Sequence, residues 1–187
     1  MTKMEKVKSI VNKLTLIALI ILLTGFSGGK NRKFEFRFHL QDIQSFVPSN
    51  QMAIWLETPD SSYVKTLFLS EYLSYGGYNL PEICSEWSSK SKWNEVTQEE
   101  FDAVTAATPS VGDVELKLQC PADLIPVGKY LVFLEVHLAD EYNELYSAEL
   151  EITGKKSITD LVVKYVPGKY PKKTEGDILR GVQVIAK

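Results

Sequence analysis

The stretch Phe34–Leu40, FEFRFHL, alternates apolar and polar side chains without a break. Its apolar residues are Phe34, Phe36, Phe38 and Leu40, and its polar residues are Glu35, Arg37 and His39. A period of two is that of a β-strand with one buried and one solvated face. The stretch therefore predicts a half-buried strand.

Seven further runs have the composition of strands. Residues 51–58 (QMAIWLET) and 63–70 (YVKTLFLS) enclose the turn-forming PDSS and predict a hairpin. The other five runs are residues 113–120, 129–138, 145–153, 157–166 and 178–186. Many short strands separated by turns predict an all-β fold, here an immunoglobulin-like β-sandwich of about eight strands with one short helix and a long loop. Tyr130 begins a strand after a glycine turn, where such sandwiches have a tyrosine that bonds back to nearby backbone.

The segment 71–96 shows neither the helical nor the strand period, and Gly76-Gly77 and Pro81 interrupt it. A loop of this length in a compact domain is usually functional, so a ligand is expected here first. Its aromatic residues either stack on a planar ligand or fold back over the core. They are Tyr75, Tyr78, Trp87 and Trp93.

A short helix is expected directly after this loop. Thr97 and Glu100 have the spacing of a capping box, in which the threonine hydroxyl accepts a backbone N–H bond and the glutamate reaches back. Pro109 disfavours helical geometry at Thr108, so the helix should end before it.

Residues 1–29 predict a secretory signal peptide, which leaves residues 30–187 as a single domain. Four lysines precede the uncharged run Leu14–Leu23, and small residues follow it. The apolar run is shorter than the ~20 residues of a membrane-spanning helix, so no membrane insertion is expected after cleavage. Cleavage would remove four Lys and one Glu from 21 basic and 24 acidic residues, changing the net charge from −3 to −6. That charge argues against a nucleic-acid partner.

No catalytic constellation is visible. His39 and His137 each fall on the polar side of an alternating strand, where a solvated histidine is expected. The chain has no GxSxG, no HExxH and no glycine-rich phosphate loop. Cys84 and Cys120 could pair in an oxidising compartment or remain two separate buried thiols, and a metal site is not expected. A hydrolytic enzyme therefore has no positive support from the sequence.

The segment Asp102–Thr108, DAVTAAT, gathers small and hydroxyl-bearing residues at the end of the expected helix. Asp102 and Thr105 could simply cap backbone groups there. The order of residues resembles the acceptor motif of proteins flavinylated by FAD:protein FMN transferases, such as the FMN-carrying subunits of sodium-translocating NADH:quinone reductases. The resemblance implies that Thr108 is esterified to the FMN phosphate, with Asp102 and Thr105 at the other polar motif positions. Ala106 stands where the motif usually has Gly or Ser.

Longer stretches are similar to the predicted periplasmic proteins of domain-of-unknown-function family 2271 (DUF2271). They are QMAIWLET, YVKTLFLS, FDAVTAATPSVG and PVGKYLVFLEV, within residues 34–152. The two resemblances imply a periplasmic or extracellular protein that carries FMN and passes electrons to membrane or periplasmic redox proteins. Its other partner would be the FMN transferase. Trp87 and Trp93 are then expected beside the isoalloxazine ring.

A cofactor-free reading is also open. An immunoglobulin-like binding or structural module could retain the segment as a relic, and Ala106 is consistent with that. Intact mass from the native host separates the two readings.

Overall fold

The expected strand at residues 34–40 is present as β1 (Asn31–Leu40), with all four of its apolar side chains buried. The computed structural model describes residues 31–43, 46–165 and 176–187. The signal peptide expected at residues 1–29 lies outside these ranges. Within them, no helix is both long and apolar enough to cross a membrane.

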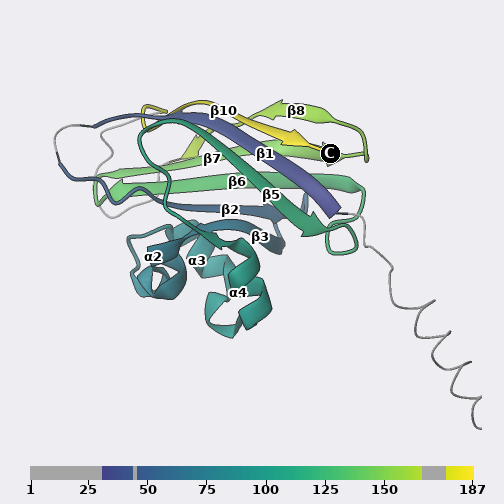
Figure 1. The fold of residues 1–187 in the computed structure, drawn as a ribbon, viewed down its shortest axis with the longest axis horizontal. Coiled ribbons are helices and arrows are strands. Elements are labelled where there is room, and N and C mark those ends of the chain that lie inside the picture. Colours follow the sequence, from purple (N-terminus) through teal and green to yellow (C-terminus); the bar gives the residue numbers. More distant parts are fainter. Residues whose placement is uncertain (1–30, 44–45, 166–175) are drawn as a thin grey trace, which may run out of the picture. The chain divides into compact units, whose positions relative to one another are not determined.

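Two sheets contain ten strands in the described part of the chain (Figure 1). The four-stranded sheet has the order β5 (Gly112–Pro121), β1, β10 (Leu179–Ala186) and β8 (Ser157–Asp160). The six-stranded sheet has the order β4 (Thr105–Ala106), β3 (Tyr63–Ser70), β2 (Gln51–Glu57), β6 (Gly128–Ala139), β7 (Tyr142–Ile152) and β9 (Val162–Tyr165). Neighbouring strands are antiparallel, except that β4 runs parallel to β3. The all-β class is confirmed, and the immunoglobulin-like topology stays a prediction.

The main core lies between the two sheets. The apolar face of β1 packs there against alternate residues of the central strands of the six-stranded sheet. These include Met52, Ile54 and Leu56 of β2 and Val132, Leu134 and Val136 of β6. The period of two in β1 therefore corresponds to this packing, because every second side chain of the strand points into the core.

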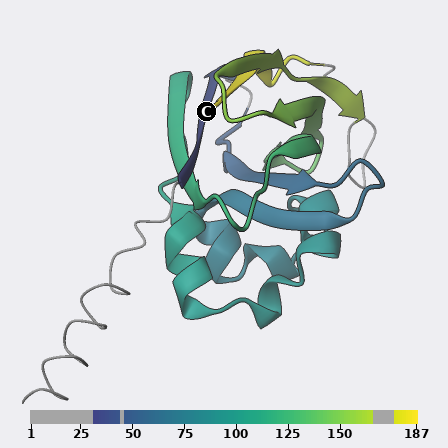
Figure 2. The same cartoon turned by 90° about the vertical axis from the view of Figure 1, so that its right-hand side faces the viewer.

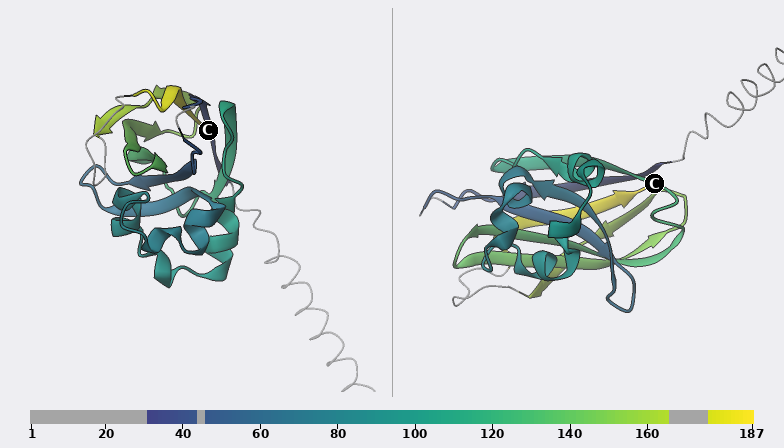
Figure 3. Two further views of the ribbon diagram at one scale, coloured as in Figure 1. Left: turned by 90° about the vertical axis from the view of Figure 1, so that its left-hand side faces the viewer. Right: turned by 90° about the horizontal axis from the view of Figure 1, so that it is seen from below.

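The six-stranded sheet is covered on its second face as well. Ala53 and Trp55 of β2 and Phe133 of β6 point away from the main core into a second buried cluster, and every residue of β2 is buried. Three short helices build this cover: α2 (Glu71–Tyr75), α3 (Ser85–Ser91) and α4 (Gln98–Val104). Figure 2 and Figure 3 show the helices gathered on that face.

The segment 71–96 is thus not the long loop that its glycines and proline suggest. It forms α2, α3 and two 3-10 turns, Gly77–Asn79 and Trp93–Glu95. Helices this short have no detectable period of their own, and packing on the sheet stabilises them. The run 157–166 also differs from its expected single strand: β8 joins the four-stranded sheet and β9 the six-stranded one, with Leu161 buried between them.

Three local expectations are confirmed. β2 and β3 form the hairpin. Tyr130 donates its hydroxyl to the carbonyl of Pro126 at 2.9 Å. Thr97 caps α4 by accepting from the backbone N–H of Glu100 at 3.2 Å, while the Glu100 carboxylate pairs with Lys65 at 2.9 Å instead of reaching back.

Candidate functional site

The segment Asp102–Thr108 runs from the last turn of α4 into β4, the edge strand of the six-stranded sheet. Helix α4 ends at Val104, whose side chain is buried and fixes the helix on the sheet. The next two residues pair with β3, Thr105 beside Leu69 and Ala106 beside Ser70.

Most of this segment faces solvent. Asp102, Ala106 and Ala107 are exposed and Thr108 is partly buried. The segment ends on the buried Pro109, whose carbonyl accepts from Asn50 Nδ2 at 3.3 Å. The result is an accessible strand of small residues held at both ends by buried anchors.

Ala106 raises no conformational difficulty. It lies in extended β4, and it is not among the non-glycine residues with positive φ. Only a left-handed backbone would have required glycine. The position therefore accepts Ala, Ser or Gly in this structure.

The two other polar motif residues lie differently. Asp102 accepts a hydrogen bond from Gln98 Nε2 at 2.7 Å on the exposed face of α4. Thr105 Oγ1 is buried and has no hydrogen-bond partner among the described residues. Buried polar atoms are rarely left without a partner, so this hydroxyl is an unusual feature of the segment.

Trp87 and Trp93 lie inside the second buried cluster. Trp87 is fully buried and donates its indole N–H to Thr66 Oγ1, and Trp93 donates to the carbonyl of Ser74, both at 2.9 Å. Neither ring presents a face to solvent. Their expected place beside a flavin stays a prediction, one that would require the helical cover to move.

The exposed aromatic residues near the segment are Tyr72 and Tyr75 of α2. They are 56% and 71% exposed, and α2 neighbours β4. The sequence singled out Tyr75 among the loop aromatics but did not separate it from the buried tryptophans, because an irregular stretch carries no period from which to infer burial.

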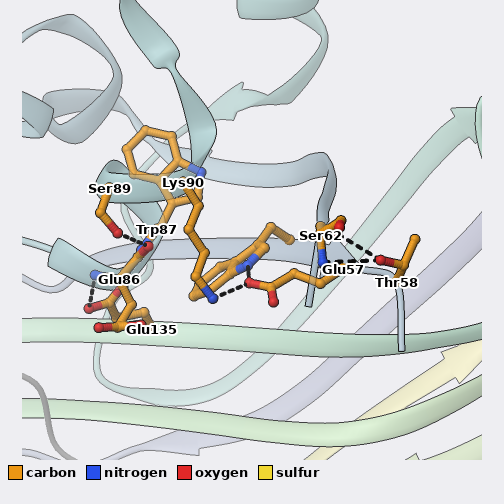
Figure 4. Close-up of polar contacts among 9 residues, drawn as sticks. Glu57, Thr58, Ser62, Glu86, Trp87, Ser89, Lys90 and Glu135 are labelled. Atoms are coloured by element: carbon orange, nitrogen blue, oxygen red, sulfur yellow. Dashed lines mark hydrogen bonds and ion pairs between the residues drawn. The ribbon is translucent and has the colours of Figure 1, made fainter. Parts of the chain in front are cut away.

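Buried carboxylates hold the helical cover on the sheet (Figure 4). Glu135 of β6 accepts from the backbone N–H groups of Glu86 and Trp87 at 3.2 and 2.9 Å. Burial raises the pKa of Glu135 to about 8, partly offset by those N–H groups. Glu57 of β2 accepts from Trp55 Nε1 and Lys90 Nζ, both at 2.7 Å.

The two histidines have different surroundings. His39 is exposed on β1 beside Asp113, as the sequence indicates. The solvated position expected for His137 is wrong: it is 5% exposed beneath the helical cover and bonds to Asn143 at 2.5 Å. The sequence of its strand gives no sign of this burial, because the helices that cover this face of the six-stranded sheet come from a distant part of the chain.

Cys84 and Cys120 are both buried and unpaired, and they belong to different clusters. Cys120 borders a groove of about 260 Å³ between β3 and α4, which also contains Lys65 and Glu100. That groove is formed without any residue of the stretch from Thr105 to Pro109. Within the described ranges, no group of three or more His, Cys, Asp or Glu residues could hold a metal ion.

Comparison with protein families gave a match over residues 36–164 to a family described as "Predicted periplasmic protein (DUF2271)". This description agrees with the export expected from the sequence. Neither the curated proteins nor the solved structures gave a match.

Proposed function

The chain belongs to the DUF2271 family of predicted periplasmic proteins, and on that premise we propose that it carries FMN covalently on Thr108 and transfers electrons outside the cytoplasm. The observation that carries the proposal is the form of the segment Asp102–Thr108. Small residues leave α4 as an exposed edge strand and end on a buried proline anchor.

This form suits a modifying enzyme. A transferase must bring the Thr108 hydroxyl into its own active site, and the exposed Ala106 and Ala107 present no bulk that would obstruct it. The anchor at Pro109 limits how far the strand can be displaced.

The chemistry is a phosphoryl-group transfer. The Thr108 Oγ1–phosphorus bond forms as the pyrophosphate bond of FAD breaks, AMP leaves, and the hydroxyl proton passes to a base of the transferase. A threonine hydroxyl is a weak nucleophile, so the base or metal that activates it must come from the transferase. The attached flavin supplies the redox chemistry, while this chain supplies position and environment.

Co-expression of the exported chain with an FAD:protein FMN transferase tests the proposal. We expect intact mass to increase by one FMN less water, and we expect Thr108→Ala to abolish the increase while Thr108→Ser retains it. Ser110→Ala is the matched control, since it removes an exposed hydroxyl two residues after the acceptor and outside the segment Asp102–Thr108.

Two results would contradict the assignment: a Thr108→Ala variant that still gains the mass of FMN, or a wild-type chain that remains unmodified. An unmodified mass from the native host as well would favour the cofactor-free, immunoglobulin-like binding module.

A further inference from the structure

Two large aromatic side chains are left in solvent on α2, beside the acceptor strand. Tyr72 and Tyr75 are three residues apart and therefore lie on one face of the helix. They are the exposed rings of a helical cover whose tryptophans are buried.

Both rings are held in place although they are exposed. Tyr75 packs edge-on against Phe101 of α4, with ring centroids 5.0 Å apart and an interplanar angle of 70°. Tyr72 lies against the backbone of Gly77, where an added Cβ would come within 3.0 Å of its ring. A ring already ordered by its neighbours loses little conformational freedom when a ligand stacks on it.

The register of β4 brings this face to the acceptor segment. Ala106 pairs with Ser70, and α2 begins at the very next residue, Glu71. Because β4 is parallel to β3, the two chains run in the same direction where Ala106 lies beside Ser70. Phe101, which supports the Tyr75 ring, immediately precedes the acceptor segment in the chain.

We propose that Tyr72 and Tyr75 form the seat on which the isoalloxazine ring of a flavin carried by Thr108 stacks; this inference rests on the proposed function. A planar, electron-poor ring system stacks favourably on the face of a tyrosine. The exposed Ala106 and Ala107, which directly precede Thr108, add no side-chain bulk beside the acceptor. The seat covers one face of the flavin and leaves the other to a redox partner.

The test uses the full exported chain, co-expressed with the transferase. A tyrosine stacked on a flavin quenches its fluorescence by donating an electron to the excited ring. We therefore expect wild-type fluorescence per attached flavin well below that of free FMN. An aromatic stacking contact favours the stacked, quenched flavin over the unstacked, fluorescent flavin by on the order of tenfold. In the Tyr72→Leu/Tyr75→Leu variant, which lacks this contact, the fluorescence per attached flavin should therefore rise by about that factor.

Three comparisons make the result specific. Tyr75→Trp preserves a stacking donor and should keep the quenching. Val127→Ala removes an apolar side chain that is 61% exposed and lies in the turn before β6, so fluorescence should not change. Intact mass gives the amount of FMN attached in every variant, independently of fluorescence.

The outcomes separate the two proposals. Full FMN attachment with equal fluorescence in the wild type and the double leucine variant overturns the seat and leaves the attachment on Thr108 standing. Absence of FMN from the wild-type mass overturns both.

Discussion

Ala106 shows how one residue can be misjudged from a motif alone. The usual Gly or Ser at its position suggests a backbone that alanine resists, yet the residue lies in an extended strand without positive φ. The departure from the motif therefore requires no unusual backbone conformation, and the side chain of Ala106 is intermediate in size between Gly and Ser.

Glu135 is the residue for which a pH effect is expected. Its carboxyl is ionised above about pH 4.5 in an unfolded chain, but burial raises its pKa to about 8 in the folded protein. Between these two pH values the carboxyl is protonated in the folded state and ionised in the unfolded state. The free energy of unfolding therefore decreases as the pH rises through this range. The charged neighbours that oppose or support its ionisation are Glu86 and Lys90.

Glu135→Gln removes this titration. Between about pH 4.5 and 8, the difference in free energy of unfolding between the variant and the wild type should increase by roughly 1.4 kcal/mol per pH unit. Loss of a hydrogen bond in the variant would add a cost that does not change with pH. Urea denaturation at a series of pH values measures it. Glu149→Gln, on the exposed side of β7, should leave the slope unchanged; equal slopes for Glu135→Gln and the wild type would contradict the prediction.

At the scale of elements, Glu144 fastens the beginning of β10 to β7. Its carboxylate accepts from the backbone N–H groups of Gly176, Asp177 and Ile178 at 2.7, 3.1 and 3.0 Å. It also accepts from the hydroxyl of Tyr146, whose pKa is raised chiefly by burial, so that this group stays a donor. A single side chain thus bridges the two sheets.

Glu144→Ala should lower the free energy of unfolding by on the order of 3 kcal/mol, because it leaves several buried donors without an acceptor. Chemical denaturation monitored by tryptophan fluorescence measures the loss. The matched control on the same strand is Glu149→Ala, which changes an exposed carboxylate and should cost little. Similar losses for the two variants would show that the bridge adds nothing.

Elements with a clear period could be predicted and elements without one could not. The alternation of β1 and the hairpin of β2 and β3 are local, since each follows from neighbouring residues and a turn. The short helices of residues 71–96 form because the sheet offers them an apolar face. The break at Leu161 depends on which sheet each half of the run can join.

At the scale of the whole molecule, the six-stranded sheet separates the two cysteines. Cys84 belongs to the cluster beneath the helices and Cys120 to the core between the sheets. Burial raises the pKa of both thiols, which lowers their reactivity as well. A disulfide between them would require one of the two clusters to open.

The exported protein should therefore contain two free thiols per chain. A thiol reagent should react with both in denaturant and with almost none in the native state. Cys120→Ser should give one thiol in denaturant, which calibrates the count. A wild-type chain without any reactive thiol in denaturant would mean that the pair is bridged.

By itself, the sequence determined the strand class, the hairpin, the capped helix α4 and the small-residue segment that carries Thr108, because each depends on residues close together in the chain. Only the tertiary structure decided that the helices cover the second face of the sheet, burying Trp87, Trp93 and His137 while leaving Tyr72 and Tyr75 in solvent. The physical reason is that burial on that face depends on which distant segments pack there, and no local period records it.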